Sequence, residues 1–282
     1  PHTPTAAPVR VDIGAPPPDE PPPSTARPQT TTAPTTTRTA PRAPATAPRS
    51  TPSAQPAPRG GRPVVWIQAG HADPREPGYR DQTGAGSGPF GSEIGFTTDL
   101  APKVIARLKA AGVDARPTPG QVEPWGAAGA AFVSLHHDSP GGAAAMGHAI
   151  AGAGENYYHG EGSGTPSPTP YSDSAAHRPA TTVSPTVESN SLALAQALDA
   201  ALRPIHTPAN GAHGRYGGVQ TREGNPRMMR YYGFYRTAAD ARVIVEAGAA
   251  GSDDAFMANT DRLADALAAG IINYLKARNQ LG

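Results

Sequence analysis

The stretch Val-Val-Trp-Ile-Gln-Ala-Gly-His, residues 64–71, combines β-branched and aromatic side chains and ends in a glycine and a histidine. An uninterrupted apolar run of this kind predicts a strand that is buried on both faces. His71 therefore lies where the strand becomes a loop. In open sheets with helical crossovers, ligands bind beyond the carboxyl ends of the strands, so His71 is a candidate functional residue.

Further strands are expected along the rest of the chain. The strand pattern is strong at residues 131–136 and 243–246 and weaker at 112–116 and 147–152. Because these segments alternate with helical ones, the pattern predicts an α/β fold. We expect a single domain with a central, mostly parallel or mixed sheet flanked by helices.

Three helices are expected between these strands. The first follows Ser92, a good N-cap residue, and Pro102 either kinks this helix or marks its true start. The others are expected at residues 188–203 and from about 254 to 281, where leucines and isoleucines recur at helical spacing.

Residues 1–62 differ in composition from the rest of the chain. Residues 1–60 hold 17 of the 34 prolines together with 12 threonines, and the first aromatic residue among Phe, Trp and Tyr is Trp66. Such a stretch cannot bury enough apolar surface to offset its chain entropy. We therefore expect a disordered Pro/Thr/Ala-rich linker over residues 1–62 and the folded domain over 63–282.

Charge and cysteine usage exclude several classes of protein. Lys and Arg number 24 against 23 Asp and Glu, without a basic run, which argues against nucleic acid as a partner. No apolar run reaches the roughly 20 residues of a membrane span. Because the chain has no cysteine, any metal must be held by His, Asp or Glu.

The sequence begins at Pro1 and not at a methionine. Removal of a signal peptide during export is one hypothesis for this start. A sequence shortened at its N-terminus for another reason would begin in the same way.

Polar residues stand at the ends of the expected elements. His71 and the pair His136 and His137 end strands, Glu93 begins the first helix, and Glu246 ends the last strand. Two imidazoles and a carboxylate with an open fourth position form the ligand set of a catalytic zinc, and a second carboxylate can serve as the base. Neighbouring residues of a strand point to opposite faces, so only one of the adjacent histidines can enter such a site.

Four motifs resemble those of the zinc-dependent N-acetylmuramoyl-L-alanine amidases, which act on peptidoglycan. They occur in the order and element context of that family: Gln-Ala-Gly-His at 68–71, Gly-Ser-Glu at 91–93, Val-Ser-Leu-His-His-Asp-Ser at 133–139 and Val-Ile-Val-Glu-Ala-Gly at 243–248. The resemblance covers about residues 64–280. Residues 116–130 and a Gly/Ser/Pro/Thr-rich insertion from about 152 to 186 differ from the family pattern.

This resemblance implies that His71, Glu93 and His136 bind one Zn²⁺ per chain and that Glu246 is the catalytic acid/base. It implies an enzyme that hydrolyses the amide between N-acetylmuramic acid and L-alanine. Peptidoglycan is then its partner, and we expect a monomer that is secreted and acts in the extracytoplasmic space or cell wall. Two alternatives remain open, a non-catalytic module that binds stem peptides and a zinc peptidase that cuts within them.

Other polar residues have less specific expected roles. Asp138 either orients a ligand imidazole or caps a loop, and His137 lies at the rim or behind the ligands. Glu246 has the alternative of an ion pair with Arg242 or Arg236. The candidates to bind a peptide carboxylate are Arg222, Arg227 and Arg230. The histidines expected to be solvated are His148, His159, His177, His206 and His213.

Overall fold

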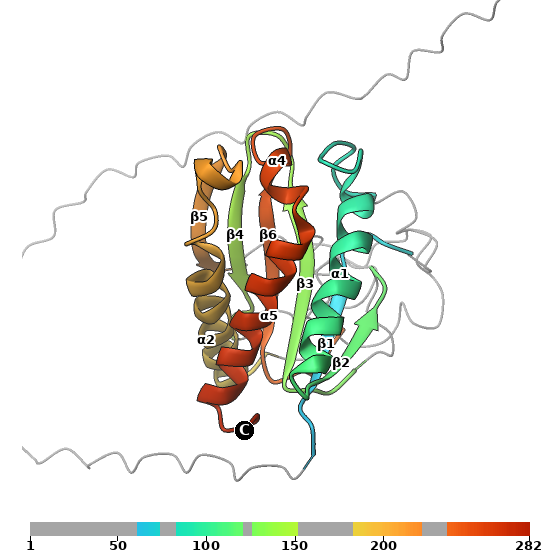
Figure 1. Ribbon diagram of the computed structural model, residues 1–282. Helices are drawn as coiled ribbons and strands as arrows, with labels where there is room; N and C mark the ends of the chain where they lie inside the picture. Colours follow the sequence, from blue (N-terminus) through green and yellow to red (C-terminus); the bar gives the residue numbers. More distant parts are fainter. Residues whose placement is uncertain (1–60, 74–82, 121–125, 152–182, 222–235) are drawn as a thin grey trace, which may run out of the picture. The chain divides into compact units, whose positions relative to one another are not determined.

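A mixed sheet of six strands lies at the centre of the structure, in the order β2-β1-β3-β6-β4-β5 (Figure 1). Neighbouring strands are parallel throughout, except that β4 is antiparallel to β6. The prediction of an α/β fold with a mixed sheet is confirmed. The strands are β1 (Val64–Ala69), β2 (Asp114–Thr118), β3 (Ala131–Asp138), β4 (Ala143–His148), β5 (Arg215–Thr221) and β6 (Arg242–Ala249).

The computed structural model describes residues 61–73, 83–120, 126–151, 183–221 and 236–282. All of these belong to one compact unit, Gln55–Gly282. Several expectations fall wholly or mostly outside the described residues and stay predictions: the linker at 1–62, the insertion at 152–186, and the roles of His159, His177, Arg222, Arg227 and Arg230.

Three long helices cover one face of the sheet and lie side by side across it in Figure 1. They are α1 (Glu93–Ala110), α2 (Pro185–Leu202) and α5 (Thr260–Ala277), accompanied by the short α4 (Asp254–Met257) and a 3-10 turn, η2 (Pro208–Asn210). Helix α5 packs against both α1 and α2. Among the described helices, none combines the length and apolar character that a membrane crossing needs.

The two faces of the sheet carry different side chains, because successive residues of a strand point to opposite sides. Val65 and Ile67 of β1 share the core beneath the helices with the apolar residues of β3 and β6. The alternate residues point to the other face. Toward the carboxyl ends of β1, β3 and β6 these residues form a buried polar row. It consists of Gln68, Ser134, His136 and Glu246.

Helix α1 begins where its N-cap was expected. Ser92 Oγ accepts the backbone N–H of Gly95 at 3.1 Å, and Glu93 is the first helical residue. Pro102 lies inside the helix, so it does not mark the start. The cap therefore sets the position of Glu93, in the first turn and at the positive end of the helix dipole.

Two element boundaries differ from expectation, and one strand was not expected. The C-terminal helix is interrupted at Asn259, which caps α5 and separates it from α4. The strand expected at 147–152 lies earlier, because β4 pairs with β6 from Ala145 to His148. Strand β5 was not expected, since two glycines and several exposed residues weaken the strand pattern at this edge of the sheet.

His148 and the side chain of His206, which is 4% exposed, are buried, which corrects the expectation that they are solvated. His148 ends β4 and is 5% exposed. The ring of His206 packs 5.1 Å from the rings of both Tyr216 and Phe256, which exclude water from it. Phe256 is distant in sequence, so the sequence around His206 alone did not indicate burial. His213 is exposed, as expected.

The buried carboxylate of Asp253 joins three separate segments. Its oxygens accept the backbone N–H groups of His213 at 3.0 Å, Gly214 at 2.8 Å and Ala249 at 2.8 Å. His206 Nε2 lies 3.3 Å from the same side chain, and Asp253 is 0% exposed. A single anion thus links the end of β6 and the start of α4 to the segment that leads into β5.

Asp253→Ala should lower the free energy of unfolding by about 3–5 kcal/mol, because it leaves buried donors without their acceptor. Asp265→Ala is the control, since Asp265 is 70% exposed and pairs with Arg107 on the surface. Its effect should stay below about 1 kcal/mol. Urea unfolding monitored by circular dichroism measures both, and equal losses would contradict the role of Asp253.

Candidate metal centre

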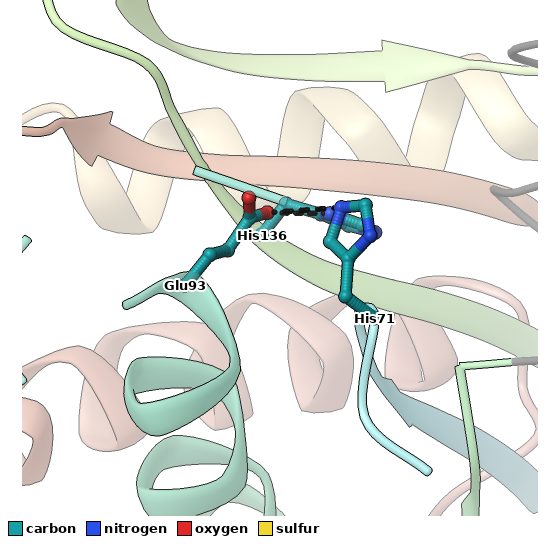
Figure 2. Close-up of side chains that lie close together, drawn as sticks. All are labelled: His71, Glu93 and His136. Atoms are coloured by element: carbon teal, nitrogen blue, oxygen red, sulfur yellow. Dashed lines mark hydrogen bonds and ion pairs between the residues drawn. The ribbon is translucent and has the colours of Figure 1, made fainter. Parts of the chain in front are cut away.

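The three expected ligand residues come together in space. His71 follows β1, Glu93 begins α1, and His136 lies near the end of β3 (Figure 2). One potential ligand atom from each lies within 4.8 Å of the others. Within the described part of the chain, this is the one cluster of three or more such residues with this geometry.

Both imidazoles approach the same carboxylate oxygen. His136 Nδ1 lies 2.7 Å from Glu93 Oε1, and His71 Nε2 lies 3.5 Å from that oxygen. The two rings stand nearly perpendicular, with centroids 4.9 Å apart. Two nitrogens and one oxygen that converge in this way match the donor set of a three-ligand zinc site.

The second oxygen of Glu93 is held by the loop that precedes α1. Ala85 N–H donates to Glu93 Oε2 at 2.8 Å, and the backbone N–H of Glu93 donates in return to the Ala85 carbonyl at 2.9 Å. Gly84 has φ +70°, and a Cβ there would lie 2.7 Å from His71 Cδ2 and collide with the carboxylate. This clamp leaves Oε1 directed at the two imidazoles.

Burial alone would raise the pKa of the Glu93 carboxyl, which is 4% exposed. The hydrogen bond with His136, the charges of His136 and His71, and the Ala85 N–H outweigh burial and lower this pKa to about 2. Glu93 therefore accepts from His136 as a carboxylate anion.

The glycine of the Gly-His pair after β1 is required by close packing. Gly70 N–H donates to the Leu135 carbonyl at 3.0 Å, and a Cβ on Gly70 would collide with that carbonyl and lie 2.5 Å from His136 Nε2. His71 itself adopts a left-handed backbone conformation, with φ +60°. The turn thus brings one imidazole beside the other.

Glu246 lies beside His136 in the sheet. The two residues are register partners on the parallel strands β6 and β3, so their side chains point to the same face. Glu246 is 7% exposed. The structure thus puts a second carboxylate on the strand next to the ligand cluster, and its role as acid/base stays a prediction.

His137 and Asp138 have structural contacts. The ring of His137 lies 5.4 Å from that of Phe96 on α1, on the helical side of the sheet, so it does not join the cluster. The backbone N–H of His137 donates to a carboxylate oxygen of the cluster at 3.3 Å, so this residue lies behind the ligands, which is one of its two expected places, and its ring is not at the rim. Asp138 accepts the N–H groups of Ser139 at 2.8 Å and Ala143 at 3.1 Å, which is the loop-capping role.

Two further residues behind the ligands were missed by the sequence analysis. Gln68 and Ser134 are both fully buried, and Ser134 Oγ lies 2.8 Å from His136 Nε2. The signal for Ser134 is strand alternation, because it lies two residues before His136, and Gln68 is the register partner of Ser134 on β1. Both therefore belong to the face that carries His136.

No protein-family model and no curated protein matches the chain. Solved structures similar to it include the N-acetylmuramoyl-L-alanine amidase AmiC2 of Nostoc punctiforme, at 18% identity and TM-score 0.45, covering 77% of this chain and 98% of that one. The amidase Ami1 from Mycobacterium smegmatis has 17% identity and TM-score 0.46, with 77% and 98% covered. The catalytic domain of the amidase CwlV from Bacillus (Paenibacillus) polymyxa var. colistinus has 17% identity and TM-score 0.42, with 76% and 98% covered. Likeness at this level carries no functional argument.

We expect the purified chain to bind about one zinc ion, and His71→Ala or His136→Ala to abolish this binding, because each removes a converging donor. His137→Ala is the matched control from the same strand. It removes an imidazole from the other face and should keep the zinc. Metal content after dialysis, measured by plasma mass spectrometry, tests this, and equal loss in all three variants would contradict the assignment.

Proposed function

We propose that this chain is a zinc-dependent N-acetylmuramoyl-L-alanine amidase that hydrolyses the bond between the lactyl group of N-acetylmuramic acid and L-alanine in peptidoglycan. The observation that carries the proposal is the convergence of His71, Glu93 and His136, with Glu246 on the adjacent strand. All four residues stand in the motifs that resemble this family.

The donor set supports zinc as the metal. His71 and His136 would supply neutral nitrogens to a zinc ion and Glu93 one anionic oxygen, which is a ligand set that proteins use for catalytic zinc. A zinc ion held by these residues supplies Lewis-acid chemistry, which polarises a carbonyl group and acidifies water. The clamp on Glu93 Oε2 keeps the carboxylate in place when the proton between Glu93 and His136 is lost.

Glu246 performs the proton transfers in this proposal. Its carboxylate accepts a proton from the attacking water as the C–O bond forms, and it delivers that proton to the departing nitrogen as the C–N bond breaks. The products are the free carboxylate of the lactyl group and the free amine of L-alanine. Burial suits this role, since a carboxylate screened from bulk water can keep the proton until the amine leaves.

We place this activity outside the cytoplasm, because peptidoglycan is there. The composition of residues 1–62 supports a Pro/Thr/Ala-rich spacer next to the folded domain. The folded domain carries all four proposed site residues in one chain, so a monomer suffices for the chemistry.

Digestion of purified peptidoglycan and of defined muropeptides tests the proposal. New amino groups on L-alanine with intact glycan strands, identified by mass spectrometry, are the expected result with zinc-loaded protein. New termini inside the stem peptide would indicate a zinc peptidase instead. Binding to peptidoglycan without any new terminus would indicate a non-catalytic module.

Glu246→Gln should keep the fold and the zinc but lose about 100-fold or more in the rate of amide hydrolysis, because the amide cannot accept a proton. Initial rates on a soluble muropeptide, with metal content measured on the same sample, test this expectation. Asp265→Ala serves as the control and should have the activity of the unmodified chain. A Glu246→Gln variant close to the wild-type rate would refute the acid/base role.

A further inference from the structure

The side chain of Gln68 has a defined orientation, because its nitrogen faces two backbone carbonyls. Gln68 Nε2 lies 2.7 Å from the Gly120 oxygen and 3.2 Å from the Pro119 oxygen, and both of these can only accept. The amide nitrogen must therefore point to Pro119 and Gly120, which follow β2 and are called the Gly120 turn below. The amide oxygen, Oε1, is left facing Ser134.

This orientation determines the direction of every hydrogen bond that follows. Gln68 Oε1 carries no proton, so the Ser134 hydroxyl donates to it. Ser134 has one hydrogen on Oγ, so toward His136 it can only accept. The donor in that contact, at 2.8 Å, is therefore Nε2–H of His136.

A proton on Nε2 decides which nitrogen of His136 is open to a metal. Nδ1 lies 2.7 Å from Glu93 Oε1, and because that carboxylate can only accept, Nδ1 carries a proton in the metal-free chain. When a metal replaces this proton while Nε2 keeps its own, the lone pair of the neutral imidazole is on Nδ1. We infer that His136 binds the metal through Nδ1, and that Gln68 and Ser134 are positioning residues that enforce this by holding the proton on Nε2. This inference rests on the proposed metal site and deepens it.

Gln68 is also connected to the other imidazole. The turn that accepts from its amide nitrogen donates in turn to the loop after β1, through Gly120 N–H and the Ala72 carbonyl at 2.6 Å. Ala72 directly follows His71. One buried amide, 0% exposed, therefore supports both imidazoles, His136 through Ser134 and His71 through the Gly120 turn.

The network could instead serve only to hold the Gly120 turn. That role needs the amide nitrogen of Gln68 but not Ser134, whose hydroxyl does not contact the turn and joins only Gln68 to His136. Ser134 is therefore the residue at which positioning and simple structural support predict different results.

Nitrogen NMR on ¹⁵N-labelled, otherwise unmodified protein tests the assignment directly. The His136 signals are those missing from the spectrum of His136→Gln. We expect Nε2 to carry its proton both without and with zinc, and the Nδ1 resonance to move when zinc is added. A zinc-loaded protein with the proton on Nδ1 would overturn the inference, and so would a chain that binds no zinc.

A matched pair of variants tests the positioning role, because threonine and valine have nearly the same shape and valine has a methyl group where threonine has its hydroxyl. Ser134→Thr keeps the acceptor and should retain the zinc affinity of the unmodified chain. Ser134→Val should raise the zinc dissociation constant about 10- to 100-fold relative to Ser134→Thr, measured by competition with a chelator. Equal affinities of the two folded variants would refute the role of Ser134.

These results are separable from the proposed activity. Zinc on Nδ1 in a chain that leaves muropeptides uncut would support the inference and refute the amidase proposal. Amide hydrolysis by a chain with zinc on Nε2 would do the reverse. The NMR measurement needs no folded Ser134 variant, so the inference stays testable if both variants fail to fold.

Discussion

The site depends on one constraint, which is that the negative charge of a buried carboxylate has to be compensated. Glu93 is 4% exposed, and an anion removed from water is costly unless hydrogen bonds and positive charge replace the lost solvation. Its partners come from three places: the loop before α1 through Ala85, the end of β3 through His136, and the turn after β1 through His71. A local feature, the cap at Ser92, and a long-range one, the register of β1 with β3, therefore have to agree at this group.

The arrangement of the layers explains why the polar groups can gather. Helices α1, α2 and α5 bury the apolar residues on one face of β1, β3 and β6, which supplies the core. Stability thus does not depend on apolar side chains at the ends of these strands on the other face. Because β1, β3 and β6 are parallel neighbours, their carboxyl ends lie at the same edge, and the side chains that emerge there can meet.

The sequence sufficed for features that depend on local patterns. Strands β1, β3 and β6, the cap at Ser92 and the gathering of His71, Glu93 and His136 were predicted from runs of residues and from motifs. Features that depend on distant partners were not, such as the burial of His206 between Tyr216 and Phe256 and the edge strand β5. Gln68 lay inside a quoted motif, yet its contact with Ser134 became visible only when the sheet register was known.

The polar row has a physical cost that bears on its purpose. Gln68 and Ser134 are fully buried in a sheet where valine or isoleucine would also pack, and each buried polar group costs about 1–3 kcal/mol unless it is hydrogen-bonded. Their hydrogen bonds recover that cost, but a satisfied polar network adds little net stability over apolar residues of the same shape. The network instead determines which nitrogen of His136 keeps its proton when a metal binds. Valine at position 134 could fill the space but could not select that nitrogen. The placement of these groups is thus better explained by the orientation of a ligand than by the stability of the fold.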